Sequence, residues 1–257
     1  MDYVLGNVLD NGDWILAFGD TEEVVQVDRQ VLEDDMDQSE VKDYLISAYL
    51  MANDYQGALD YLKNASTEDN DTYHKVAFLY GSQLFKEQQF TKAIENFNLS
   101  IENVSNSVYK ARSIFWKSES LYRLKKYEEA LSGFQEFSEL PEAKETLEYS
   151  MVLYHLAYTY FQLKDYNQAG GHFNEYITVA NDEKLLTDGY LRLGDCFFAL
   201  SSYFKAIPAY EKVIEANETD VDYAQLQIAF CYGYMGETDK KIKALNDFTE
   251  VNLKSTL

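Results

Sequence analysis

The chain has 257 residues, of which 46% are hydrophobic and 15% aromatic, so it holds enough apolar material for one large or two small domains. Its formal net charge of -22 at pH 7 comes from 44 acidic and 22 basic residues. A charge of that sign repels phosphates and anionic membrane surfaces, which argues against nucleic-acid binding. No apolar run approaches the roughly 18–20 residues of a membrane span, which argues against direct membrane insertion.

Residues 1–38 form an acidic lead-in that we expect to be a degenerate or partial helical repeat. Residues 11–13 read as a turn, and the spacing Trp14-x-x-Ala17 echoes a pattern found further along the chain. Thr21 and the two acidic residues after it can cap a second helix. The acidic cluster that follows lacks the spaced oxygen ligands of a calcium loop, so we interpret it as a solvated connector.

From Ser39 onward the chain repeats one pattern, in which an aromatic residue opens each second helix of a pair. Ala follows three residues later, and an apolar ring or Leu comes four residues after that. The copies are Tyr55-x-x-Ala58 with Leu62, Phe90-x-x-Ala93 with Phe97, Tyr127-x-x-Ala130 with Phe134, Tyr166-x-x-Ala169 with Phe173, and Tyr203-x-x-Ala206 with Tyr210. A degenerate sixth copy begins at Thr238. The recurrence of apolar residues at three- and four-residue spacing predicts amphipathic helices.

Small residues mark the places where the two helices of a pair should cross. A small residue lies nine positions before the opening residue in most copies. The Ala three residues after each aromatic opening residue is the second small residue of the pair. From both positions we expect close helix contacts at Gly81, Ala93, Ala130, Ala157, Ala169, Gly194 and Ala206. No pair can bury its apolar face alone, so the pairs must stack on their neighbours.

This pattern resembles the tetratricopeptide repeat, a helix–turn–helix unit with a period near 34 residues. The resemblance covers about residues 39–250, and the long spacing of the copies is similar to that in repeats of bacterial envelope proteins. It departs from the family where Ile46 takes a small position and Lys117 an apolar one. The resemblance implies an all-α, right-handed superhelix (α-solenoid) of about six helix pairs over residues 39–257. It also implies a non-catalytic scaffold that binds a protein or peptide.

In a stack of this kind the first helix of each pair lines the concave face. The candidate groove residues are Phe78, Phe85, Phe115, Trp116, Glu119, Tyr122, Tyr154, His155, Tyr158, Phe161, Arg192, Asp195 and Phe198, flanked by Lys75, Arg112 and Arg123. Aromatic residues and Arg are the types that usually carry binding energy, so we expect a peptide to lie there. The alternatives are that the rings only pack against neighbouring helices, that the acidic outer face or the array ends mediate assembly, or that the rings bind carbohydrate. The family's clamp for an acidic C-terminus is missing its Asn and Lys residues, which disfavours that ligand.

No catalytic constellation appears in the sequence. The three histidines are scattered, without a carboxylate or Cys at metal-ligand spacing, and the motifs of nucleophilic and phosphate-binding sites are absent. We therefore expect no catalytic residue, metal or cofactor. Cys196 and Cys231 occupy equivalent places in successive repeats and are expected to be small buried hydrophobes. The Gly170-Gly171 pair predicts close helix packing or a local kink.

The two ends of the array lack a polar capping helix in the sequence. We expect either that the chain belongs to a longer array or that its ends associate with a second copy. Met1 is followed by Asp2 without a basic segment, so no secretory signal is visible. The expected compartment is the periplasm or envelope if a signal has been removed, and the cytoplasm otherwise.

Overall fold

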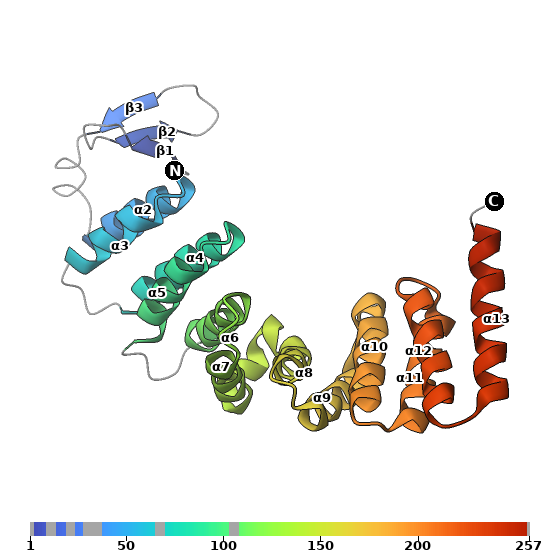
Figure 1. Ribbon diagram of the computed structural model, residues 1–257. Helices are drawn as coiled ribbons and strands as arrows, with labels where there is room; N and C mark the ends of the chain where they lie inside the picture. Colours follow the sequence, from blue (N-terminus) through green and yellow to red (C-terminus); the bar gives the residue numbers. More distant parts are fainter. Residues whose placement is uncertain are drawn as a thin grey trace. The chain divides into compact units, whose positions relative to one another are not determined.

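The computed structural model describes residues 3–8, 14–18, 24–27, 38–64, 70–102 and 108–255. The chain divides into two compact units, residues 1–113 and 114–257 (Figure 1). The described residues include twelve α-helices that form six consecutive pairs. The prediction of an all-α solenoid of about six pairs is therefore confirmed for residues 38–255 outside the gaps.

The lead-in is different from the prediction, because its described residues form strands, apart from Gln38, which begins helix α2 (Gln38–Met51). Strands β1 (Tyr3–Val8), β2 (Trp14–Phe18) and β3 (Val24–Val27) form an antiparallel sheet in the order β1-β2-β3. Tyr3 pairs with Phe18, and Trp14 pairs with Val27. The expected helical repeat was wrong here because short runs rich in Val, Ile and aromatic residues favour extended backbone over helix. The acidic connector after β3 lies largely outside the described residues.

The first unit continues with two helix pairs and the start of a third. Their bounds are α2 (Gln38–Met51), α3 (Tyr55–Asn64), α4 (Asn70–Lys86), α5 (Phe90–Ile101) and α6 (Val108–Arg123), and the division between the units falls within α6. Ile46, Ala58 and Val76 belong to one buried cluster, which joins side chains from three successive helices. Stacking of neighbours thus supplies the core that a single pair lacks.

The second unit holds the rest of the array. Its elements are α7 (Tyr127–Glu139), the short 3-10 helices η1 (Pro141–Glu145) and η2 (Leu147–Met151), α8 (Val152–Gln162), α9 (Tyr166–Val179), α10 (Glu183–Ala199), α11 (Tyr203–Ala216), α12 (Val221–Tyr234) and α13 (Thr238–Ser255). Pro141 follows the end of α7 and begins η1, since proline lacks the N–H that a continuing helix would use. The segment η1–η2 lengthens this repeat relative to the others.

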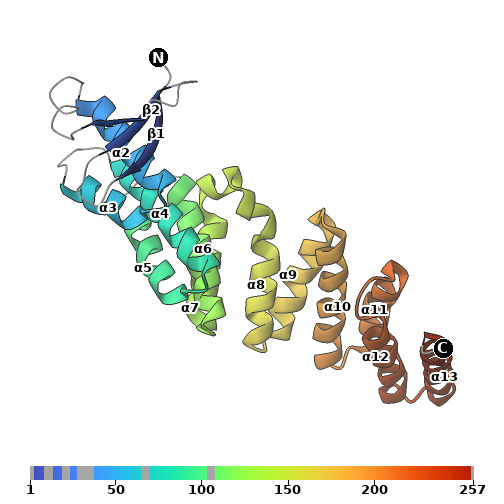
Figure 2. The same ribbon diagram turned by 90° about the horizontal axis from the view of Figure 1, so that it is seen from above.

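Each predicted opening residue begins its helix. The second helices start at Tyr55, Phe90, Tyr127, Tyr166, Tyr203 and Thr238, as the spacing predicts. Two residues before each opener the backbone is left-handed, with φ of 56° at Asn53, 60° at Gln88, 62° at Lys125, 63° at Lys164, 56° at Ser201 and 77° at Gly236. One left-handed residue per turn reverses the chain, so the paired helices lie side by side, as α8 and α9 do in both ribbon views (Figure 2).

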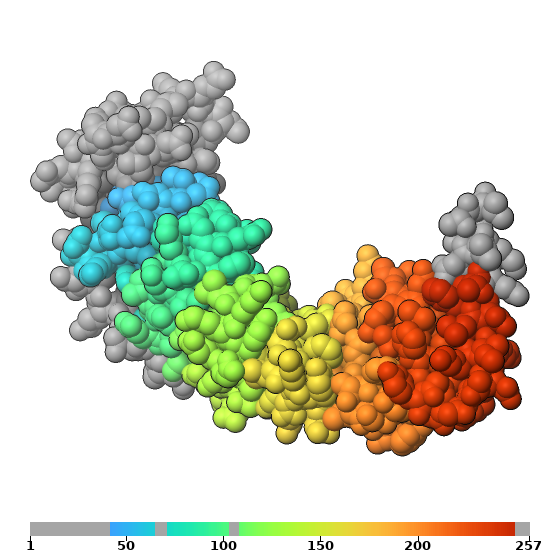
Figure 3. Space-filling view, viewed as in Figure 1, coloured from blue at the N-terminus to red at the C-terminus, as the bar shows by residue number. Residues whose placement is uncertain are grey.

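Small residues lie at the helix crossings, as predicted. A Cβ atom added to Gly81 would lie 2.7 Å from the ring of Phe97, and one added to Gly194 would lie 2.6 Å from the ring of Tyr210. The alanines at the other predicted crossings, Ala93, Ala130, Ala157, Ala169 and Ala206, are fully buried. Side chains fill the space between successive helices of the second unit (Figure 3). These contacts allow the paired helices to approach closely.

Candidate functional site

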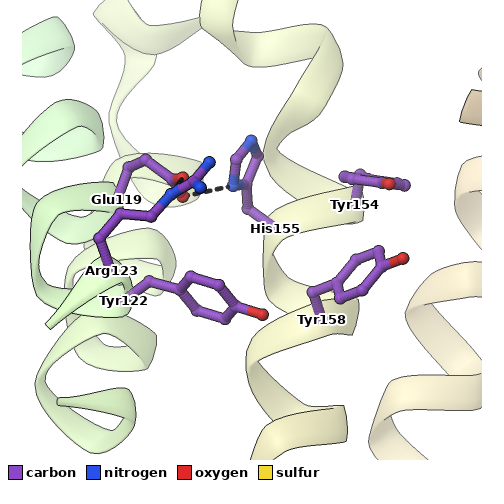
Figure 4. Close-up of a pocket in the computed structure, with 6 residues that line it drawn as sticks. All are labelled: Glu119, Tyr122, Arg123, Tyr154, His155 and Tyr158. Atoms are coloured by element: carbon purple, nitrogen blue, oxygen red, sulfur yellow. Dashed lines mark hydrogen bonds and ion pairs between the residues drawn. The ribbon is translucent and has the colours of Figure 1, made fainter. Parts of the chain in front are cut away.

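The described residues of the second unit form an open, shallow pocket between the first helices of two successive pairs. It has a volume of about 190 Å³. Its walls come from the end of α6 and from α8, and the lining residues are Glu119, Tyr122, Arg123, Tyr154, His155 and Tyr158 (Figure 4). All six belong to the groove residues predicted from sequence. The fold thus brings together the aromatic and charged side chains of two neighbouring repeats.

Glu119 places a buried carboxylate in this pocket, with only 4% of its side chain exposed. Its Oε1 accepts a hydrogen bond from Nε of Arg123 at 2.7 Å, one turn along α6. Its Oε2 lies 3.0 Å from Nδ1 of His155 on α8 (Figure 4). Burial by itself raises the pKa of Glu119, but the hydrogen bonds and charges of His155 and Arg123 outweigh it and hold the pKa below its ordinary value. The carboxylate is therefore ionised and ties two repeats together.

The tyrosines of α8 are fixed by a polar network that extends to α10. Tyr154 donates to Oδ2 of Asp188 at 2.8 Å, and Tyr158 donates to the same oxygen. Nε of Arg192 donates to the Tyr158 hydroxyl oxygen at 3.1 Å. Burial raises the pKa of Tyr158 to about 12, aided by its hydrogen bond to Asp188, and burial also raises the pKa of Tyr154. Both hydroxyls therefore stay protonated, and both rings are held in place.

Asp195 continues this network toward α11 and α12. Its Oδ1 accepts hydrogen bonds from Tyr210 and Tyr223, each at 2.9 Å, and its Oδ2 lies 2.9 Å from a terminal nitrogen of Arg192. Burial raises the pKa of Asp195, against the lowering effect of these donors. One carboxylate therefore links three successive helices, so Arg192 and Asp195 are parts of the scaffold.

Two predicted groove residues are core residues, and this corrects the sequence-based assignment. Phe78 and Phe115 are each only 3% exposed. The Phe115 ring packs against Phe134, Phe137 and His155 in the second unit. The assignment failed because the offset counted from the opening residue does not define which way a ring turns at each helix crossing.

Other predicted residues are engaged by neighbouring side chains. In four repeats the last aromatic residue of the first helix packs against the opener of the second: Phe85 on Phe90, Tyr122 on Tyr127, Phe161 on Tyr166, and Phe198 on Tyr203. Nε1 of Trp116 donates to the buried Glu148 of η2 at 2.9 Å. In the first unit Lys75 is exposed, and the guanidinium of Arg112 lies 4.6 Å from the centre of the Phe78 ring. Part of the predicted aromatic surface therefore serves packing.

Sequence reasoning missed Asp188 and Tyr223 as members of the polar network, and Glu148 as the acceptor for Trp116. Asp188, Arg192 and Asp195 follow one another at four and three residues on α10, a spacing that places them on one helix face. That spacing was the available signal.

Within the described part of the chain, no three His, Cys, Asp or Glu residues are grouped so that they could hold a metal ion. No described helix combines the length and the apolar character needed to cross a bilayer. Cys196 and Cys231 are free and buried, as predicted. Gly170 is buried against the Cβ of Cys196, whereas α9 runs without interruption through Gly171.

The comparisons with known proteins concern the repeat itself. One tetratricopeptide repeat family model matches residues 151–179 and 223–251, and a second matches residues 187–220. No curated protein sequence matches the chain.

Solved structures share the fold at low sequence identity. A MamA crystal structure aligns with a TM-score of 0.60 and 19% identity, over 71% of this chain and 93% of MamA. MamA from Desulfovibrio magneticus RS-1 aligns with a TM-score of 0.58 and 13% identity, over 74% of this chain and 98% of that one. YrrB, titled a TPR protein with an unusual peptide-binding site, aligns with a TM-score of 0.58 and 14% identity, over 77% of this chain and 91% of YrrB. The repeat matches, the helix pairs and the small-residue crossings together identify the chain as a tetratricopeptide repeat protein.

Proposed function

We propose that this protein is a non-catalytic scaffold that binds an extended segment of a partner protein along the first helices of its second unit. The observation that carries the proposal is the pocket between α6 and α8, which combines three tyrosine rings with Glu119, Arg123 and His155. Tyr concentrates binding energy because its ring offers a large contact area together with a polar group. Tetratricopeptide repeat proteins act as protein-interaction modules, and the peptide-binding site named for YrrB supports the same use of this fold here.

The rigidity of the pocket supports binding as well. The hydroxyls of Tyr154 and Tyr158 are held by Asp188, so a ligand would meet rings that are already ordered. A preorganised surface loses less entropy when it binds. Tyr122 completes the pocket from the other side, and its ring packs edge-on against Tyr127 at 5.3 Å.

The test is a selection of displayed random peptides on the full chain, followed by affinity measurements on the enriched sequences. Tyr122→Ala should weaken binding by about tenfold or more, because it removes a ring from the pocket. Phe204→Ala is the matched control: it truncates an aromatic residue that is 65% exposed on α11, outside the pocket, and should leave binding unchanged. Equal effects of the two variants, with folding intact, would refute the proposal. A glycan array on the same protein tests carbohydrate as the occupant.

A further inference from the structure

We propose that the pocket between α6 and α8 receives the cationic side chain of an Arg or Lys residue in the partner segment, at the place on Glu119 that Arg123 now holds. This inference rests on the proposed function and adds the chemistry of the ligand. Its elements are a buried carboxylate, a replaceable internal cation, a ring of aromatic faces and a surrounding excess of negative charge.

The buried carboxylate provides the attraction. Glu119 is almost wholly removed from solvent and still ionised, since its pKa is held low by its two neighbours despite its burial. An ionised carboxylate away from bulk water interacts with a cation more strongly than one on the surface does. The side chain also faces the pocket, so a cation entering there can reach it (Figure 4).

Arg123 shows that a guanidinium fits this position, and it is bound there from the solvent side. It contacts Glu119 through Nε, and 56% of its side chain is exposed. Only the carboxylate end of this ion pair is buried, so most of the Arg123 side chain is hydrated where it stands. The side chain can therefore turn into solvent when a ligand cation replaces it. A ligand guanidinium entering from the pocket could engage the carboxylate through two parallel hydrogen bonds, which this single Nε contact does not provide.

The tyrosines suit a cation in addition to an apolar group. Tyr122, Tyr154 and Tyr158 present rings along the pocket, and Figure 4 shows the Tyr154 and Tyr158 hydroxyls directed away from Glu119. The faces of such rings attract ammonium and guanidinium groups. Because the Tyr154 and Tyr158 hydroxyls are held by Asp188, their rings stay in place when the ligand changes.

The negative charge around the pocket also favours a cationic ligand. On α10 the two carboxylates of Asp188 and Asp195 face a single guanidinium, that of Arg192, which pairs with both. The second unit, residues 114–257, holds 23 acidic and 14 basic residues, which gives it a net charge of -9. An acidic peptide would be repelled by this field, whereas a basic one would be attracted and its binding would weaken as salt is added.

The experiment uses random twelve-residue peptides displayed on particles and selected on the immobilised full chain. We expect Arg or Lys to be enriched at one fixed position, and replacement of that residue by Gln in a synthetic peptide to weaken binding by about tenfold, the scale of a lost charged hydrogen bond. Glu119→Gln should remove the preference. Arg123→Ala should tighten binding several-fold because it removes the internal competitor, and an unfolded protein could not produce that gain.

Glu129→Gln is the matched control, because it removes the same charge from a residue on α7 that is 61% exposed and paired only with Lys126 among the contacts described for it. It should leave the peptide preference unchanged. Enriched peptides that lack a basic residue but lose affinity with Tyr122→Ala would overturn the cationic ligand and leave the binding groove in place. An unaltered preference in Glu119→Gln would also overturn it. Failure to enrich any peptide would contradict both the ligand and the proposed function.

Discussion

Gly194→Ala tests whether close helix contact stabilises this array. The new Cβ would lie 2.6, 2.8 and 2.9 Å from three ring atoms of Tyr210, distances that real Cβ atoms do not tolerate. The Tyr210 ring cannot move aside easily, because it is fully buried and its hydroxyl is bonded to Asp195. Overpacking of this kind costs about 1–3 kcal/mol, and the better helix propensity of Ala returns about 1 kcal/mol. Because the ring is buried and its hydroxyl is bonded, we expect a cost in the upper part of this range, about 2–3 kcal/mol, and a net loss of about 1–2 kcal/mol in the free energy of unfolding.

Gly171→Ala is the matched control, because it also lies inside a helix but no atom outside its local backbone lies within 4 Å of the new Cβ. It should raise stability by about 0.5–1 kcal/mol through helix propensity alone. Urea unfolding followed by circular dichroism at 222 nm measures both variants. In a Tyr210→Leu background, the Gly194→Ala change should lose its penalty, because the ring that it meets is gone. A Gly194→Ala protein as stable as the wild type would refute the reasoning.

Three further predictions follow from buried groups. Asp195→Ala should lower the free energy of unfolding by about 3 kcal/mol, since it leaves two tyrosine hydroxyls and Arg192 without their shared acceptor. In the same urea assay, Glu215→Ala, which changes an exposed residue, should alter the free energy of unfolding by less than about 0.5 kcal/mol. Burial raises the pKa of Cys196 to about 12 and that of Cys231 to about 11. Neither thiol should therefore react with an aromatic disulfide reagent at pH 8 until the protein unfolds. Rapid labelling of the native protein would contradict this prediction. The pKa of Glu119 is depressed, so its contribution to stability is present above the ordinary carboxyl pKa and is lost as the pH falls through the pKa of the folded state. Glu119→Gln should therefore reduce the loss of stability between pH 5 and pH 3. An unchanged dependence of stability on acid pH would rule out this linkage.

Sequence predicted the helix pairs because the repeat fixes their local geometry. Opening residues such as Tyr166 and Tyr203 begin their helices as expected, and Gly81 and Gly194 lie against buried rings. These features depend on neighbours within one hairpin, whose spacing the sequence displays directly. Six groove residues also meet in one pocket, because equivalent positions of adjacent first helices come close whenever pairs stack.

The remaining errors concern relations that spacing does not encode. The hydrogen bonds from Tyr154 and Tyr158 to Asp188 join residues that are 34 and 30 positions apart and lie on different hairpins. These bonds depend on how far one helix pair is rotated relative to the next. Whether Phe115 faces the groove or the core depends on the same rotation. In the lead-in, the prediction gave more weight to the helix-like spacing of Trp14 and Ala17 than to the strand preference of the residues around them. The structure follows the strand preference.

The left-handed turns offer a way to engineer the protein that leaves the pocket-lining helices untouched. At Gln88, Lys125, Lys164 and Ser201 a residue with a side chain adopts a conformation that glycine adopts without steric penalty. None of these four residues lines the pocket. Glycine introduced at successive turns would raise the thermal stability of the protein in small steps. In such a stabilised protein, a variant with weaker binding could be purified and measured without being lost to misfolding.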